Sequence, residues 1–202
     1  MKPIAKLLIS LVWFQYAALC AGQSPDDSVA VVIFQTEHGE IETLLYLNKA
    51  PVTCANFLSY VELAGGAGGI FYRTVTLDNQ PDKNIKIEVI QGGFNLEDIP
   101  EDQVVPIPLE RTNQTGLGHT DGTLSMARDE PDSGSTEFFI CIGDQPELDF
   151  GGKRNPDGQG FAAFGRVTRG MDIVKKIQLS PADGQSLNPP VRIIKVKRRS
   201  AY

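Results

Sequence analysis

The stretch GIFYRTV, residues 69–75, sets an arginine inside a run that otherwise reads as a strand. Side chains of an extended strand alternate between its two faces, so Phe71, Arg73 and Val75 are expected to share one face. Phenylalanine and valine indicate that this face is apolar. An arginine placed between them is expected to have a functional role. The alternative is a surface arginine whose aliphatic stem covers Phe71.

Strand-like runs surround this stretch along the chain. Apolar runs of strand length, separated by loops rich in Gly, Pro, Asn and Asp, occur at 29–36, 39–47, 70–76, 86–91, 123–127, 137–142, 161–168 and 191–196. A helix is predicted from Pro51, with Cys54, Phe57, Leu58 and Val61 on one face and Gly65-Gly66 as its stop. A second short helix is predicted at 171–178.

The order of these elements predicts the fold class. Strands and helices do not alternate, which argues against a parallel sheet. We therefore expect a mainly β protein, a closed eight-stranded antiparallel barrel capped by two helices, because closure removes exposed sheet edges.

The N-terminal segment reads as a signal peptide. Lys2 and Lys6 precede an apolar run at 7–19, and small residues follow at Ala21 and Gly22. This run is short for a membrane span. We expect a cleaved signal over 1–22, a flexible lead-in over 23–28, one domain over 29–198, and a periplasmic or secreted product. An uncleaved anchor and a lipid anchor at Cys20 are the alternatives.

The charge balance bears on partners. Without Lys2 and Lys6, 17 of the 19 basic residues remain against 25 acidic ones, which gives a net charge of −8. Such a chain is expected to repel nucleic acid and anionic membranes.

Two cysteines remain after the signal, Cys54 and Cys141, both in apolar surroundings. Export would permit a disulfide between them, but buried free thiols are the favoured interpretation. Without a CxxC pair and with only His38 and His119, a zinc site is not expected.

Other reaction types have little support in the sequence. Cys141 and Ser135 are the candidate nucleophiles of a hydrolase, but neither has a histidine nearby in the sequence. The glycines at 65–69 lack the Gly-Lys-Ser/Thr that would complete a phosphate-binding loop.

Six separated motifs carry a resemblance when they are taken together. They are FYR (71–73), VIQGG (89–93), LSMAR (124–128), STEFFIC (135–141), ELD (147–149) and GFAAFGRV (160–167). In this order and spacing they resemble the cyclophilin family of peptidyl-prolyl cis–trans isomerases, from about Val29 to Val196. The family fold is an eight-stranded antiparallel barrel with two capping helices, as the element count predicts.

The resemblance implies roles at matching positions. Arg73 matches the catalytic arginine, and Gln91 matches the glutamine that orients it and holds the substrate backbone. The remaining matches are to substrate-binding positions: Val89, Met126 and Leu148 at or beside the pocket walls, Phe139 at the floor, Phe161 at a pocket position that is histidine in many family members and aromatic in some bacterial ones, and Ala127 and the backbone near Arg128 along the groove for residues before proline. No cofactor or metal is implied.

Several positions depart from the family pattern. Glu88 and Glu147 stand where a phenylalanine and a tryptophan are usual. Because the tryptophan belongs to the family's binding of cyclosporin, weak cyclosporin affinity is expected. The segment LDNQPDKNIK, residues 77–86, is longer than the usual short turn and is called the insertion below. The 151–160 loop, GGKRNPDGQG, is also long.

The sequence thus predicts an exported, monomeric bacterial-type cyclophilin that isomerises X-Pro bonds in unfolded or newly exported polypeptides. The competing hypothesis is a proline-binding or chaperone module on the same fold with weak turnover.

Overall fold

The computed structural model describes residues 28–63, 68–95, 97 and 99–199. The predicted signal peptide, most of the lead-in and the Gly65-Gly66 helix stop lie outside these residues.

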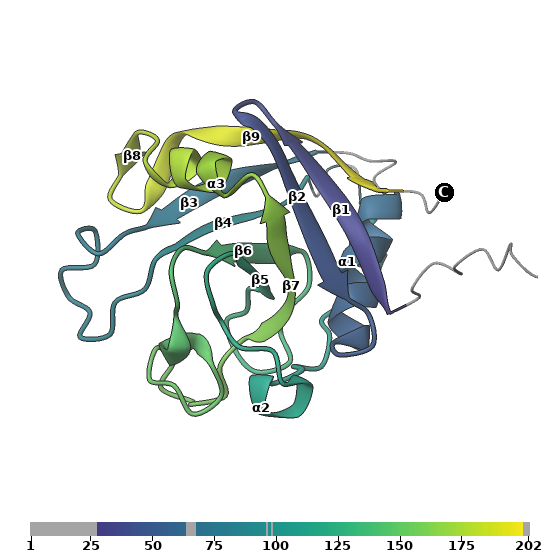
Figure 1. Cartoon of the computed structure of the whole chain (residues 1–202), viewed down its shortest axis with the longest axis horizontal. Coiled ribbons are helices and arrows are strands. Elements are labelled where there is room, and N and C mark those ends of the chain that lie inside the picture. Colours follow the sequence, from purple (N-terminus) through teal and green to yellow (C-terminus); the bar gives the residue numbers. More distant parts are fainter. Residues whose placement is uncertain (1–27, 64–67, 96, 98, 200–202) are drawn as a thin grey trace, which may run out of the picture.

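Eight strands close into a barrel, as predicted (Figure 1). The strands in the described residues are β1 (Val29–Thr36), β2 (Gly39–Tyr46), β3 (Gly69–Val75), β4 (Val89–Phe94), β5 (Thr123–Met126), β6 (Glu137–Cys141), β7 (Ala162–Arg169), β8 (Ala182–Asp183) and β9 (Ser186–Arg198). The neighbour order is β1-β2-β7-β5-β6-β4-β3-β9, and β9 pairs back onto β1. Every pairing is antiparallel. The short β8 lies outside the ring and pairs only with β9.

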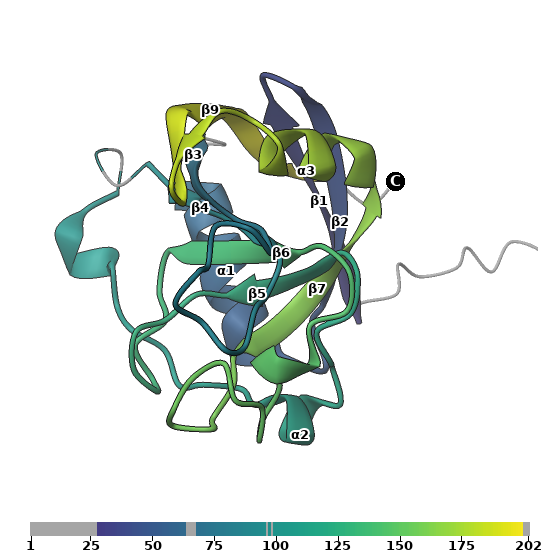
Figure 2. The same ribbon diagram turned by 90° about the vertical axis from the view of Figure 1, so that its left-hand side faces the viewer.

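Both predicted helices are present, as α1 (Pro51–Leu63) and α3 (Met171–Gln178). The apolar face predicted for α1 is buried, and Glu110 caps the helix by accepting hydrogen bonds from the backbone N–H groups of Val52 and Thr53 at 3.1 and 2.8 Å. The turned view shows α3 and β9 on the opposite side of the molecule from α2 (Thr112–Thr115), a single turn that the sequence pattern did not predict (Figure 2). Two short 3-10 turns, η2 (Glu101–Gln103) and η3 (Pro146–Leu148), also lie in the described residues.

Two strands, β4 and β9, differ from their predicted runs by more than one residue. The run predicted at 86–91 becomes β4 only from Val89, because the N–H and C=O of Ile87 bond instead to the side chain of Gln80 at 3.3 and 2.8 Å. The run predicted at 191–196 extends back to Ser186 as β9, where it pairs with the end of β3 and with β8.

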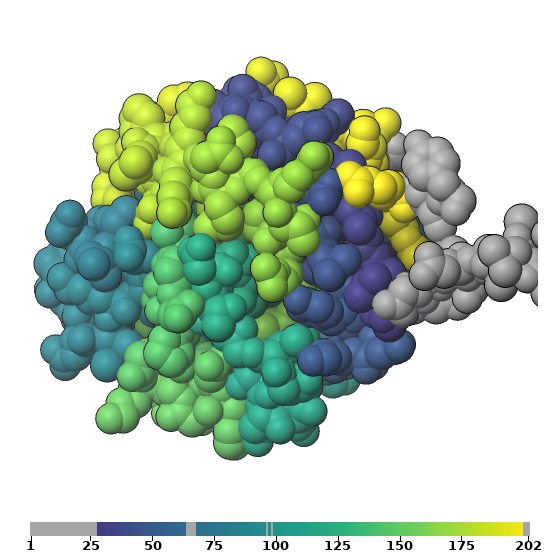
Figure 3. Space-filling model, in the orientation of Figure 1, coloured from purple at the N-terminus to yellow at the C-terminus, as the bar shows by residue number. Residues whose placement is uncertain are grey.

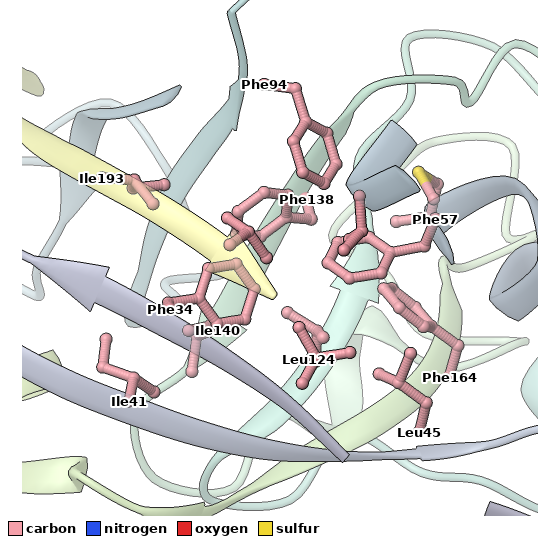
Figure 4. Close-up of a cluster of buried hydrophobic side chains, with 14 of the residues drawn as sticks. Phe34, Ile41, Leu45, Phe57, Phe94, Leu124, Phe138, Ile140, Phe164 and Ile193 are labelled. Atoms are coloured by element: carbon pink, nitrogen blue, oxygen red, sulfur yellow. The ribbon is translucent and has the colours of Figure 1, made fainter. Parts of the chain in front are cut away.

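The barrel interior is filled with aromatic and branched side chains (Figure 4). Phe57 of α1 lies at the centre, with ring centroids 5.2 to 6.1 Å from those of Phe34, Phe94, Phe138 and Phe164. Helix α1 therefore packs its buried face against the strands, with the Phe57 ring at the centre of the contact.

A β-bulge at Tyr72 decides where the side chains of β3 point. Phe71 pairs with Gly92 and Arg73 with Gln91, so Tyr72 is an extra residue between them. Phe71 is fully buried in the barrel core, whereas Arg73 is partly exposed and hydrogen-bonds to residues outside the core. The expectation that both share a face is therefore wrong, because the bulge reverses the alternation.

Candidate functional site

A second apolar cluster lies outside the barrel core, and we call it the pocket cluster. It consists of Val75, Ile87, Val89, Ala127, Phe139, Cys141 and Leu148, with Phe161 packed against it. Alternation explains this separation along β6: Phe138 and Ile140 enter the core, so Phe139 and Cys141 face the other way. The chain thus builds two apolar surfaces from one sheet.

Phe161 and Arg128 form one wall of the cluster. The Phe161 ring packs edge-on to Phe139 with centroids 5.2 Å apart, and the Arg128 guanidinium carbon lies 5.1 Å from the centre of the Phe161 ring. Two hydrogen bonds of 2.8 and 3.0 Å join the Arg128 guanidinium to the Asp157 carboxylate. These bonds hold the pKa of Asp157 below its ordinary value. The ion pair therefore holds the planar Arg128 guanidinium over the Phe161 ring.

Arg73 is held by two neutral amides. Its Nη1 donates to Gln91 Oε1 at 2.8 Å, and its Nε and Nη2 donate to Gln185 Oε1 at 3.0 and 2.6 Å. A guanidinium carries five N–H donors, so two form no hydrogen bond with the described residues and remain for a ligand. Neutral partners leave its positive charge uncompensated, and that charge is available to a substrate.

The amide of Gln91 is oriented by a second pair of residues. Its Nε2 donates to the Tyr72 hydroxyl at 2.6 Å and to Glu137 Oε2 at 3.0 Å, and the Tyr72 hydroxyl donates to the same Glu137 oxygen at 2.6 Å. Burial, followed by the Glu137 carboxylate, raises the pKa of Tyr72. Because both N–H groups of Gln91 are engaged, its oxygen must face Arg73.

A Ser–His–Asp arrangement, in which Ser125 and His119 are buried and Asp149 is partly exposed, supports the floor of the cluster. The His119 ring stacks on Phe139 with centroids 5.9 Å apart and an interplanar angle of 16°. Asp149 Oδ1 lies 2.6 Å from His119 Nδ1, and Ser125 Oγ lies 2.9 Å from His119 Nε2. Since a carboxylate only accepts, Nδ1–H donates to Asp149, and in a neutral imidazole Nε2 then accepts from the Ser125 hydroxyl.

The structure brings together most of the residues predicted for the site. Arg73 and Gln91 are hydrogen-bonded to each other. The pocket cluster or its wall contains Val89, Ala127, Arg128, Phe139, Leu148 and Phe161.

Met126 lies elsewhere. It belongs to the barrel core and pairs with Phe138, because alternation along β5 sends Leu124 and Met126 inward. Its neighbours Ser125 and Ala127 face the site instead. The sequence interpretation of Met126 as a pocket residue is not supported by this placement.

Several residues of the site carry no signal in the sequence. Gln185 is 112 positions from Arg73 in the chain, in the turn between β8 and β9, and its residue type alone does not distinguish it. Tyr72 and Glu137 belong to motifs named above, and strand alternation could have placed Glu137 and Phe139 on one face.

The alternative chemistries find no support in the geometry. Both described cysteines are free and buried, and burial raises the pKa of Cys54 to about 12 and that of Cys141 as well. The favoured interpretation of free thiols is confirmed, and neither thiol is suited to nucleophilic attack. Within the described ranges no group of three or more His, Cys, Asp or Glu could hold a metal, and no helix is long and apolar enough to cross a membrane.

Comparison with known proteins agrees with this geometry. The family model described as "Cyclophilin type peptidyl-prolyl cis-trans isomerase/CLD" matches residues 31–198. A peptidyl-prolyl cis-trans isomerase of Acinetobacter baylyi is 36% identical over 176 residues, which cover 84% of this chain and 86% of the relative. Peptidyl-prolyl cis-trans isomerase B of Escherichia coli is 35% identical over 149 residues, covering 73% of this chain and 84% of the relative.

A solved structure shares the fold. The crystal structure of a Cryptosporidium parvum cyclophilin-type isomerase superposes with a TM-score of 0.65 at 21% identity, covering 86% of this chain and 99% of that one. The chain therefore belongs to the cyclophilin-type peptidyl-prolyl cis–trans isomerases.

Proposed function

We propose that this protein accelerates rotation about X-Pro peptide bonds, with Arg73 as the catalytic residue and the pocket cluster as the proline site. The observation that carries this proposal is the position of Arg73. Two amides hold its guanidinium beside an apolar cluster with Phe139 as its floor, and its charge and two of its N–H groups are unused.

The reaction needs an electrostatic donor rather than an acid, a base or a nucleophile. Resonance imposes a barrier of about 18–20 kcal/mol on amide rotation. In the twisted transition state the proline nitrogen becomes pyramidal and regains its lone pair. An Arg73 N–H directed at this nitrogen stabilises the twisted form more than either planar form, which is differential binding.

The other residues support that contact. The pocket cluster holds the proline ring and removes water, which strengthens the electrostatic interaction. Gln91 fixes the guanidinium, and Ala127 with the Arg128 backbone aligns the residues before proline. One well-placed donor contributes roughly 2.7–4 kcal/mol, or about two to three powers of ten in rate.

An NMR exchange assay on a short X-Pro peptide tests this mechanism. The wild-type protein is expected to accelerate exchange above the spontaneous rate, and Arg73→Ala to lose about a hundredfold or more. Arg73→Lys should be nearly as impaired, since lysine lacks the planar fork. A proline-binding module without turnover would bind the peptide and leave the wild-type exchange rate at the spontaneous value.

We further propose that the protein is exported and acts as a monomer on unfolded or newly exported chains. The support is the sequence pattern of Lys2, Lys6 and the apolar run at 7–19. Cell fractionation with N-terminal sequencing of the mature protein tests export, and retention of residues 1–22 would contradict it. Light scattering on the purified protein tests the monomer.

Weak cyclosporin binding is a separate proposal that depends on Glu147. Its Oε2 accepts a hydrogen bond from the Lys153 backbone N–H at 2.8 Å, so a carboxylate occupies the position of the usual tryptophan. Glu147→Trp is expected to increase inhibition by cyclosporin. Sub-micromolar inhibition of the wild-type enzyme would contradict the proposal.

A further inference from the structure

The insertion is hydrogen-bonded to the end of β3, the strand that carries Arg73, and to the β8–β9 turn, which carries Gln185. The Asn79 side chain accepts from the Thr76 N–H at 2.9 Å and donates to the carbonyls of Thr74 and Gly184 at 3.0 and 3.1 Å. The Asn79 backbone carbonyl accepts from Gln185 Nε2 at 3.1 Å. The insertion is therefore tied to Gln185, which binds Arg73.

The next residue, Gln80, ties the insertion to a second arginine. Its side chain is buried, at 2% exposure, and donates to the carbonyls of Thr76 and Ile87 at 2.6 and 2.8 Å. Its oxygen accepts from the Ile87 N–H and from Arg154 Nη1, the latter at 2.8 Å. Arg154 Nη1 also donates to the Ile85 carbonyl at 2.7 Å. A saturated buried amide thus fixes the Arg154 guanidinium.

Arg154 lies at the edge of the pocket cluster. Its partner Gln80 hydrogen-bonds to the backbone of Ile87, a member of that cluster. The backbone N–H of Arg154 donates to the carbonyl of Glu147, the residue before Leu148, at 3.1 Å. In the space-filling view the insertion and the 151–160 loop adjoin on the surface (Figure 3).

Neither arginine forms an ion pair within the described part of the chain. Among the residues that the structure describes, the ion pairs involve neither Arg73 nor Arg154. Burial lowers the pKa of Arg154, and the positive charge of Arg73 lowers it further. Two partly buried guanidinium groups therefore repel each other beside the pocket, an arrangement that an incoming carboxylate would relieve.

The nearby acidic side chains are engaged elsewhere. Glu147 Oε2 accepts from the Lys153 backbone and Glu88 Oε1 accepts from Gln178 Nε2 at 3.2 Å. Neither forms an ion pair with Arg154. The Arg154 Nε and Nη2 groups form no hydrogen bond with the described residues and remain free to bind a ligand.

We propose that this isomerase prefers substrates with Asp or Glu immediately after the proline, and that Arg154 binds that carboxylate. This inference rests on the proposed function, which places residues before the proline along Ala127 and Arg128. The chain after the proline then leaves past Ile87 and Leu148, where Arg154 lies. Arg154 is thus a specificity residue that the insertion holds in place.

The test is a set of X-Pro peptides that differ only beside the proline, measured by NMR exchange. The peptides carry Glu, Gln or Lys after proline, and a fourth carries Glu before it. Wild-type kcat/KM is expected to be about twofold to fivefold higher for Glu than for Gln after proline, the range of a partly exposed ion pair. The ratio should fall towards one in about 1 M NaCl, where the Debye length is about 3 Å.

Variants assign the preference to one arginine. Arg154→Gln is expected to abolish the Glu/Gln ratio, and Arg154→Lys to keep part of it. Lys153→Gln removes one charge from the same loop and is expected to keep the full ratio, because the Lys153 side chain forms no ion pair with the described residues. Since the wild-type peptide series does not depend on any variant, a misfolded variant does not obscure the result.

The outcomes distinguish a failure of this inference from a failure of the proposed isomerase function. Equal wild-type rates for Glu and Gln after proline, or a preference for Glu before it, would overturn the role of Arg154. A ratio that survives in Arg154→Gln would overturn it as well. Failure to accelerate any of the peptides would instead contradict the isomerase function.

Discussion

Gln185 Oε1 accepts hydrogen bonds from both Nε and Nη2 of Arg73, at 3.0 and 2.6 Å, across 112 positions of the chain. One oxygen thus fixes the edge of the guanidinium that faces away from Gln91. The orientation of Gln185 depends in turn on the Asn79 carbonyl, which accepts from its Nε2. Arg73 is therefore held from both sides, by β4 and by the β8–β9 turn.

Replacing Gln185 should impair turnover more than binding. In Gln185→Ala the guanidinium loses two of its three bonds, and we expect kcat to fall roughly tenfold with a smaller change in KM, the scale of one hydrogen bond to a charged group. Gln185→Glu keeps the acceptor oxygen and should recover part of kcat. Ser186→Ala, an exposed neighbour, is the matched control. Full activity in Gln185→Ala would mean that Gln91 alone positions Arg73.

The Tyr72 hydroxyl should matter through Gln91. Tyr72→Phe removes one of the two partners that hold the Gln91 amide, so its oxygen is less firmly directed at Arg73. We expect kcat to fall about twofold to fivefold, as for the loss of one neutral hydrogen bond. The measurement is NMR exchange at saturating peptide, with Tyr46→Phe as the control. An unchanged kcat would show that Glu137 is sufficient.

The two described thiols should resist modification. Cys54 lies in the barrel core with a pKa raised to about 12, and burial also raises the pKa of Cys141 in the pocket cluster. In a Cys20→Ser background, Ellman's reagent at pH 8 should label neither thiol in the native protein and both in guanidinium chloride. Rapid labelling of Cys141 in the native state would show that the pocket floor opens.

The Arg128–Asp157 pair should be insensitive to pH in the neutral range. Because the pKa of Asp157 is lowered from its ordinary 3.8, its contribution to stability is complete above that value. It is lost only as the pH falls through the still lower pKa of the folded state. The difference in unfolding free energy between wild type and Asp157→Asn should therefore be constant from pH 5 to 8.

The same variant should affect substrate binding. Without its carboxylate partner, Arg128 is less firmly held over Phe161, and we expect KM to rise a few-fold with little change in kcat. Asp129→Asn, an exposed neighbour in the sequence, serves as the control for lost charge. In the pH experiment on Asp157→Asn, a difference in unfolding free energy that varies between pH 5 and 8 would mean that another group titrates with the Arg128–Asp157 pair.

Strand alternation and family spacing predicted the barrel and most of the pocket. The period of two in β6 separates Phe138 from Phe139, and the motif order places Arg73, Gln91 and Phe139 in one site. These features depend on local pattern, which a sequence carries directly.

Features that depend on distant pairing were not predictable. The bulge at Tyr72 arises from the register of β3 against β4 and β9 together, so alternation placed Phe71 on the wrong face. Met126 was assigned to the pocket from its motif, although its own alternation turns it into the core. Gln185 meets Arg73 only because β9 returns beside β3.

The Ser125–His119–Asp149 arrangement beneath Phe139 has the hydrogen-bond order of a serine hydrolase triad. Ser125 is 0% exposed, and His119 is covered by the Phe139 ring, so the three residues act as a brace under the proline site. A catalytic relay and a scaffold can thus share the same atoms and differ only in whether solvent reaches the hydroxyl. New chemistry on this barrel would first require a route to Ser125, since its base and its carboxylate are already aligned.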